Sequence, residues 1–281
     1  MGYGVWDIPE RDASTGYWEA LTISQSQRAD STQLHLLFAK GRRPDSAAIR
    51  SFAARQQANI ISNQPFAKDP AQPAAVWPGQ QLWIELLREG LTFDLSGLGP
   101  GPQSDFPQIE HRFDLPDIPT PETHEALAFL PGPHIVAGGR SQPVVRAMLA
   151  LACDLILHFD DLAAIGWGPS RSAIGRRFFE SVISAWLDGG PFPALGLTAF
   201  TENPDGALES LGLAFWTGQE LRIEPPLSFE KVAATRLGIR LVNQLVLAGR
   251  LNSDERIIAP DGTRLVLRPS ADQTLISVVR E

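Results

Sequence analysis

The chain has 281 residues, 43% of them hydrophobic and 20% charged, and its formal net charge is −8 at pH 7. This length suits one large domain or two modest ones, and the composition is ordinary for a globular protein. The acidic balance argues against a sequence-independent nucleic-acid binder and against a protein held on anionic membranes, because both need a net or clustered positive field.

Signals of export or membrane insertion are absent from the sequence. The single cysteine, Cys153, cannot form a disulfide within the chain, and its apolar surroundings indicate a small buried thiol. The N-terminus lacks a basic stretch followed by an apolar core, and no apolar run approaches the roughly 20 residues that span a bilayer. We therefore expect a cytoplasmic protein without a signal peptide.

Residues 1–125 are predicted to form a first α+β half. A helix begins near Asp45, which follows a proline and is a good N-cap. Residues 82–87 fit a strand or a helix, because a short apolar run does not decide between them. The other predictions are an irregular arm over 1–31, strands at 34–39 and 60–61, and a loop over 63–80.

Residues 103–125 are rich in proline and aspartate. Proline lacks a backbone donor and disfavours helix in the residue before it, so this stretch is predicted to be extended surface chain. We place the boundary between two halves at its end, which gives domains 1–125 and 126–281.

The second half has more regular patterns. Predicted helices are 141–158 with Ser141 as N-cap, 172–187, and 228–248 with Ser228 as N-cap. Predicted strands are 126–130, 163–167 and 220–224, followed by a meander with strands near 257–258, 265–267 and 275–279.

Two similar segments, 195–200 and 211–216, are predicted to form an antiparallel hairpin at the centre of a sheet. The segment between them contains Asn203-Pro204-Asp205-Gly206, a sequence typical of a turn. One face of this hairpin carries Gly196 and Gly212, which leave room for close approach by a backbone, a partner or a ligand.

These elements predict an α+β fold, with a mixed, mainly antiparallel sheet covered by helices, because the late strands are joined by hairpins. Strand, basic loop and helix recur at 34–55 and at 163–186. This recurrence has two possible interpretations, a duplication that relates the two halves and a common local arrangement.

Two glycine-rich helix entrances are the candidate ligand sites. Each would present free backbone donors and a positive helix end to an anion. The residues concerned are Ser170, Arg171 and Ser172 in one, and Arg140 and Ser141 in the other. The alternative for both is an ordinary capped helix start with solvated arginines.

His134, near the second entrance, is the histidine best placed for a general base or a ligand contact, with a structural histidine as the alternative. His158 beside Asp160 and Asp161 lacks further ligands at metal spacing, so helix capping is the preferred interpretation. We predict no metal, no cofactor and no catalytic residue set.

The second half also resembles a known family. Ile165-Gly166-Trp167-Gly168-Pro169-Ser170, the two Gly-Leu segments and Gln219-Glu220-Leu221 resemble an uncharacterised bacterial domain-of-unknown-function family over about residues 126–226. Such glycine and leucine patterns specify a fold more than a site, so the resemblance implies no activity and no site residues.

Two hypotheses on function follow. The first is a non-catalytic cytoplasmic interaction or accessory protein, with a protein partner or a second copy of the chain covering the glycine face. The second is a domain or enzyme that binds a small anionic ligand at the helix entrances near 138–141 and 168–172. The first is preferred, because no catalytic or metal set is recognisable.

Overall fold

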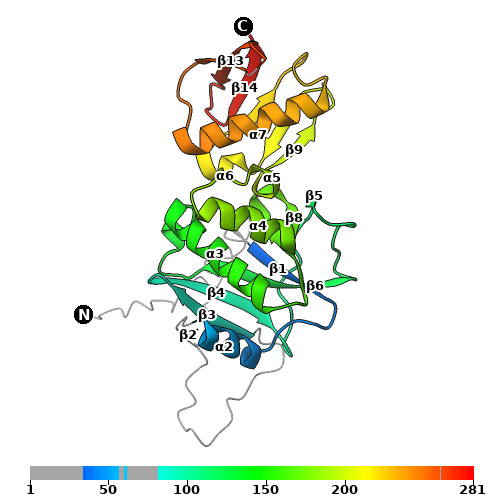
Figure 1. Ribbon diagram of the computed structural model, residues 1–281, viewed down its shortest axis with the longest axis vertical. Helices are drawn as coiled ribbons and strands as arrows, with labels where there is room; N and C mark the ends of the chain where they lie inside the picture. The colour runs from blue at the N-terminus through cyan, green and yellow to red at the C-terminus, as the bar shows by residue number, and fades with distance from the viewer. Residues whose placement is uncertain (1–33, 57–59, 62–81, 260) are drawn as a thin grey trace, which may run out of the picture.

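A computed structural model describes residues 34–56, 60–61, 82–259 and 261–281 (Figure 1). The predicted arm over 1–31 and the predicted loop over 63–80 lie outside these residues. The described chain forms helices and two mixed, mostly antiparallel sheets. The α+β prediction is therefore confirmed, and the two sheets divide the molecule into two lobes.

The first lobe, residues 34–187, is built on a sheet with strand order β2-β3-β4-β6-β1-β7-β8-β5. All neighbouring strands are antiparallel except β5 and β8, which are parallel. The strands are β1 (Leu34–Ala39), β2 (Ile60–Ile61), β3 (Leu82–Arg88), β4 (Leu91–Leu98), β5 (His111–Phe113), β6 (His124–Pro131), β7 (Leu162–Trp167) and β8 (Ser172–Gly175).

Helices α2 (Ser46–Arg55), α3 (Gln142–His158) and α4 (Arg176–Leu187) bury their apolar sides in one core with this sheet. Asp45 caps α2 as predicted, because its carboxylate accepts a hydrogen bond from the Ala48 N–H at 2.7 Å. In α3 the predicted apolar stripe is buried along nearly the whole helix. Burial of such stripes is the main source of stability for the lobe.

The proline-rich connector covers part of the opposite face of the sheet. Phe106, Ile109 and Leu115 pack there against a second apolar cluster, which consists of Leu37, Ala126, Ala164 and Ala173. The connector is extended, as predicted, but the domain boundary predicted at its end is wrong. Strand β6 lies between β4 and β1, so backbone hydrogen bonds join the chain before and after residue 125 in one sheet.

The second lobe, residues 198–281, has the strand order β12-β13-β14-β11-β10-β9. Only β11 and β14 are parallel among these neighbours. Helix α7 (Lys231–Ala248) packs on one face through Leu241, Val242 and Leu245. The strands are β9 (Ala199–Glu202), β10 (Leu208–Leu211), β11 (Glu220–Ile223), β12 (Glu255–Ile258), β13 (Arg264–Pro269) and β14 (Leu275–Arg280), which confirms the predicted C-terminal meander.

The two lobes meet at α5 (Ala194–Leu197) and α6 (Leu213–Thr217), which Figure 1 shows between them. The predicted hairpin is therefore only partly correct. β9 and β10 do pair in antiparallel fashion, but residues 195–197 of the first predicted strand lie in α5, residues 213–216 of the second lie in α6, and β9 is an edge strand. Gly196 and Gly212 have φ values of +96° and +97°, and this backbone conformation ends the extended path.

The first lobe itself covers the two glycines. A Cβ atom on Gly196 would lie 2.9 Å from Ile174 Cδ1, and one on Gly212 would lie 2.9 Å from Ser170 Cβ. The close approach predicted from the small residues is thus made by the segment between β7 and α4. Trp216 of α6 completes the junction by stacking on Trp167, with ring centroids 6.2 Å apart.

Candidate functional site

The first predicted anion site, Ser170–Ser172, is not a helix entrance. A 3-10 turn (Gly168–Ser170) and strand β8 follow β7, and α4 begins only at Arg176. The Ser170 hydroxyl is buried and donates to the Gly196 carbonyl at 2.9 Å, while Ser172 Oγ lies 2.8 Å from Ser170 Oγ. Arg171 forms an ion pair with Glu110 at 2.7 Å. These residues join the lobes, so the helix entrance predicted here is wrong.

The second predicted entrance does precede a helix. Helix α3 follows Ser141, but the Ser141 side chain makes no capping hydrogen bond. The Arg140 guanidinium lies over the Phe215 ring, 5.1 Å from its centroid, and so bridges the two lobes. His134 is exposed in the turn before this helix. None of the six predicted ligand residues lines the pocket that the described residues form between the lobes.

That pocket has a volume of about 370 Å³ and lies where β5 of the first lobe approaches α5, β9 and the start of α7. Figure 1 shows β5 and β8 beside α5, below β9. The lining of the pocket combines aromatic and aliphatic side chains with a few charged and polar groups. The residues are His111, Arg112, Phe113, Leu195, Phe200, Glu202, Gly206, Leu208, Ser228, Lys231 and Thr235.

Strand β5 supplies the wall from the first lobe. His111 Nε2 lies 3.4 Å from the Thr201 hydroxyl of β9, so the imidazole bridges the lobes at one side of the pocket. Burial lowers the pKa of His111, and Arg171 lowers it further, while Glu110 opposes the shift. These effects favour the neutral form of the ring, which offers one donor and one acceptor nitrogen.

The start of α7 supplies the opposite wall. Lys231 Nζ forms an ion pair with Glu202 of β9 at 2.5 Å. The N-cap of α7 is Glu230, whose carboxylate accepts from the Ala233 N–H at 2.9 Å, so the predicted cap, Ser228, is wrong. The Ser228 hydroxyl donates instead to the Gly206 carbonyl at 2.6 Å, which ties the approach to α7 to the β9–β10 turn.

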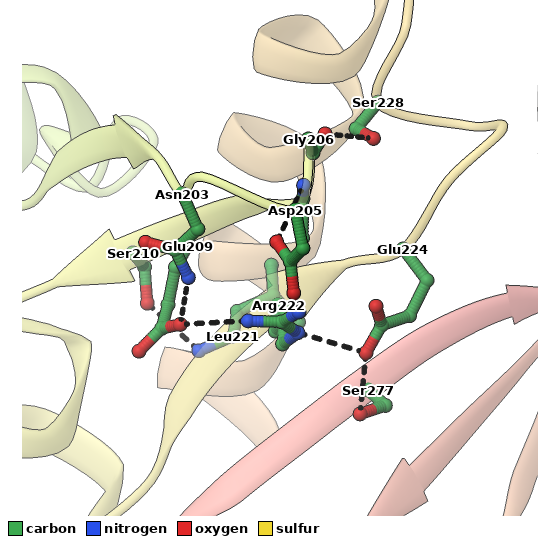
Figure 2. Close-up of polar contacts among 11 residues, drawn as sticks. Asn203, Asp205, Gly206, Glu209, Ser210, Leu221, Arg222, Glu224, Ser228 and Ser277 are labelled. Atoms are coloured by element: carbon green, nitrogen blue, oxygen red, sulfur yellow. Dashed lines mark hydrogen bonds and ion pairs between the residues drawn. The ribbon is translucent and has the colours of Figure 1, made fainter.

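The side chain of Arg222 contacts three carboxylates and anchors that turn (Figure 2). Its guanidinium lies 2.9 Å from Glu224 and 3.4 Å from Glu209, and it also contacts Asp205 within the turn. The Asp205 carboxylate accepts from the Ala207 N–H at 3.1 Å, and this bond, followed by Arg222, lowers the pKa of Asp205. Because Gly206 lies between these anchored positions, the network fixes one wall of the pocket.

A second group of titratable residues lies far from this pocket, on β3 and β4. Glu85 and Asp94 are direct cross-strand neighbours on the face opposite the helices. Burial and then the charge of Glu85 raise the pKa of Asp94 to about 6, while His134 lowers it. Within the described ranges, no group of three or more His, Cys, Asp or Glu residues is arranged to hold a metal ion.

This raised pKa predicts a stability difference that depends on pH. A carboxyl whose folded pKa exceeds its unfolded value of 3.8 favours folding fully below pH 3.8, and this contribution is lost as the pH rises through about 6. Asp94→Asn is therefore expected to stabilise the protein by about 1–2 kcal/mol at pH 7.5, after allowance for the partial exposure of the side chain. Urea unfolding at pH 4 and pH 7.5 measures this.

The matched control is Asp117→Asn, because the Asp117 side chain is 96% exposed. This change is expected to leave the unfolding free energy unaltered at both pH values. Equal stability of wild type and Asp94→Asn at pH 7.5 would contradict the burial of a charged Asp94.

Comparison of the chain with family models, curated proteins and solved structures found no match. The described helices include none long and apolar enough to cross a membrane.

Proposed function

We propose that the protein is a non-catalytic recognition protein whose inter-lobe pocket binds a ligand with an anionic group beside an apolar one. The observation that carries this proposal is the pairing of cations and an apolar floor in one cavity between two lobes. The anion-binding hypothesis thereby moves from the helix entrances to this pocket.

The charges at the pocket favour an anion. Lys231 and Arg112 bring two cations to its wall, and Glu202 is the one carboxylate among the lining residues. Glu202 already pairs with Lys231, but both side chains are more than half exposed, so the pair is weak and open to competition. Arg112 lies 3.9 Å from Asp117, whose side chain is almost fully exposed, and it too can turn to a ligand.

The floor favours an apolar group next to that anion. Phe113, Phe200 and Leu208 line it, and Leu195 remains 36% exposed there. Phe200 is held in place by α7, since a Cβ on Gly238 would lie 2.6 Å from its ring. A volume of about 370 Å³ falls at the lower end of the range of small-ligand sites.

Hexanoate, phenylacetate and N-acetyl-leucine, each tested beside its amide, are suitable probes. We expect the acids to raise the melting temperature of the wild type and the amides to have little effect, because a ligand that binds only the folded state stabilises it. Lys231→Ala is expected to weaken binding of the best acid roughly tenfold, which corresponds to about 1.4 kcal/mol. Isothermal titration calorimetry measures the affinity.

Arg236→Ala is the matched control, because Arg236 is an exposed cation on the same helix and does not line the pocket. It is expected to bind the acids as the wild type does. Absence of any melting-temperature rise with the three acids, or unchanged affinity in Lys231→Ala, would contradict the proposed function.

A further inference from the structure

Both sheets of the molecule end at the pocket. β5 is the last strand of the first sheet, and β9 is the last strand of the second. Residues from both strands line the cavity. Edge strands carry backbone donors and acceptors on their outer side that a further strand can pair with.

The hydrogen-bond pattern of β9 identifies its outward groups. Asn203 N–H donates to the Ala207 carbonyl at 2.8 Å, and Glu202 is paired with Leu208 in the register of the hairpin. Hydrogen-bonded and non-hydrogen-bonded pairs alternate along antiparallel strands, so Thr201 bonds to β10 while Phe200 and Glu202 do not. The backbone N–H and C=O groups of Phe200 and Glu202 therefore point away from the sheet.

Strand β5 also has outward backbone groups. His111 N–H donates to the Arg171 carbonyl at 3.1 Å in the parallel pairing with β8. The N–H and C=O of the next residue, Arg112, therefore point outward. All three residues with outward backbone groups, Arg112, Phe200 and Glu202, line the pocket.

Apolar side chains continue beyond the pocket along its rim. Phe229 is 71% exposed and Val232 is 56% exposed at the approach to α7 and on its first turn. A Cβ on Gly206, which lines the pocket, would lie 3.9 Å from the Phe229 ring. An exposed apolar rim of this kind beside a charged cavity is typical of a recognition surface.

We propose that the ligand of this pocket is the carboxyl-terminal end of an extended peptide, which adds as a strand to the outer edge of β9. The inference rests on the proposed function and specifies its ligand. The terminal carboxylate lies against Lys231, the last side chain lies on the floor at Phe113 and Phe200, and the peptide backbone pairs with Phe200 and Glu202. Main-chain pairing then gives affinity, and the floor gives selectivity for an apolar last residue.

Charge and length both favour a chain end over an internal segment. Only two residues of β9 offer outward backbone groups, so pairing with this strand gives a peptide few hydrogen bonds. A terminal carboxylate adds a charge-assisted contact with Lys231 that an internal peptide bond does not provide.

The test compares Glu202→Pro with Glu202→Ala. Both remove the carboxylate, but only proline removes the outward N–H, and proline is tolerated on an edge strand where the N–H makes no ladder bond. The probes are short acetylated peptides, randomised except for an apolar last residue with a free carboxylate. Peptides selected on the wild type are then titrated against both variants, and hexanoate, which has no amide, is titrated in parallel.

We expect the wild type and Glu202→Ala to bind a selected peptide and Glu202→Pro to bind it at least tenfold more weakly, with hexanoate binding equal in the two variants. Binding of hexanoate without selection of any peptide, or equal peptide binding by the two variants, would overturn the strand-addition proposal and leave the proposed function standing. Failure of both probes would overturn both.

If Glu202→Pro does not fold, which its melting temperature would reveal, a second measurement on the wild type takes its place. Single N-methyl groups are placed at successive positions of the selected peptide. Strand addition predicts at least a tenfold loss of affinity at alternate positions only, whereas unchanged affinity at every position would contradict it.

Discussion

Glu220→Ala is expected to lower the free energy of unfolding by about 3–5 kcal/mol, because it leaves several buried donors unsatisfied at about 1–3 kcal/mol each. The Glu220 carboxylate accepts hydrogen bonds from the backbone N–H groups of Gly212, Leu213 and Ala214 at 2.8, 3.1 and 3.0 Å, and from the Ser210 hydroxyl. These are the donors at the first turn of α6, which has no other cap. Alanine leaves them buried and unsatisfied.

Glu220→Gln separates the acceptor from the charge. Burial raises the pKa of Glu220, although the hydroxyl and backbone hydrogen bonds oppose the shift, so the negative charge itself is disfavoured at this position. Glutamine keeps one acceptor oxygen and carries no charge. Glu220→Gln is therefore expected to lower the free energy of unfolding by only about 1–2 kcal/mol. Urea unfolding monitored by tryptophan fluorescence measures both, since Trp216 of α6 stacks on Trp167. Wild-type stability in Glu220→Ala would contradict this role.

His35 is expected to make the protein sensitive to acid. The side chain is 3% exposed, and burial lowers its pKa to about 4 from 6.5. A histidine with a lowered folded pKa favours folding above pH 6.5, and this contribution is lost as the pH falls towards 4. The wild type should therefore lose up to about 3 kcal/mol from this one group over that interval.

The variant His35→Leu tests this, because leucine does not titrate and the Nδ1 atom of His35 has no hydrogen-bond partner to lose. The unfolding free energy of His35→Leu is expected to fall less than that of the wild type between pH 7.5 and pH 4.5. Asp117→Asn, a change at a side chain that is 96% exposed, serves as control and should follow the wild type. Parallel curves for wild type and His35→Leu would contradict the buried neutral imidazole.

Local patterns in the sequence were sufficient to predict the elements whose hydrogen bonds and burial depend on residues close in the chain. The apolar stripe of α3 and the Asp45 cap of α2 are examples. The hairpin prediction failed at Gly196 and Gly212, because a strand pattern and a turn with positive φ share the same small residues. The predicted domain boundary failed because composition does not report which strands pair across a long connector.

The pocket could not be predicted for a related reason. His111 lies in a strand context that carries no functional signal. It contacts Thr201, and lines one pocket with Lys231, only through the packing of two sheets. One signal was present in the sequence, namely Gly238 inside the pattern of α7. Glycine is unfavourable in a helix, and here it makes room for the Phe200 ring.

A crystal structure of the protein with a selected acetylated peptide tests most directly whether the inter-lobe pocket is the binding site. We predict electron density for an extended chain along the outer edge of β9, with its carboxylate at Lys231 and its last side chain against Phe200. Density for the peptide elsewhere on the molecule, with an empty pocket between the lobes, would contradict the account.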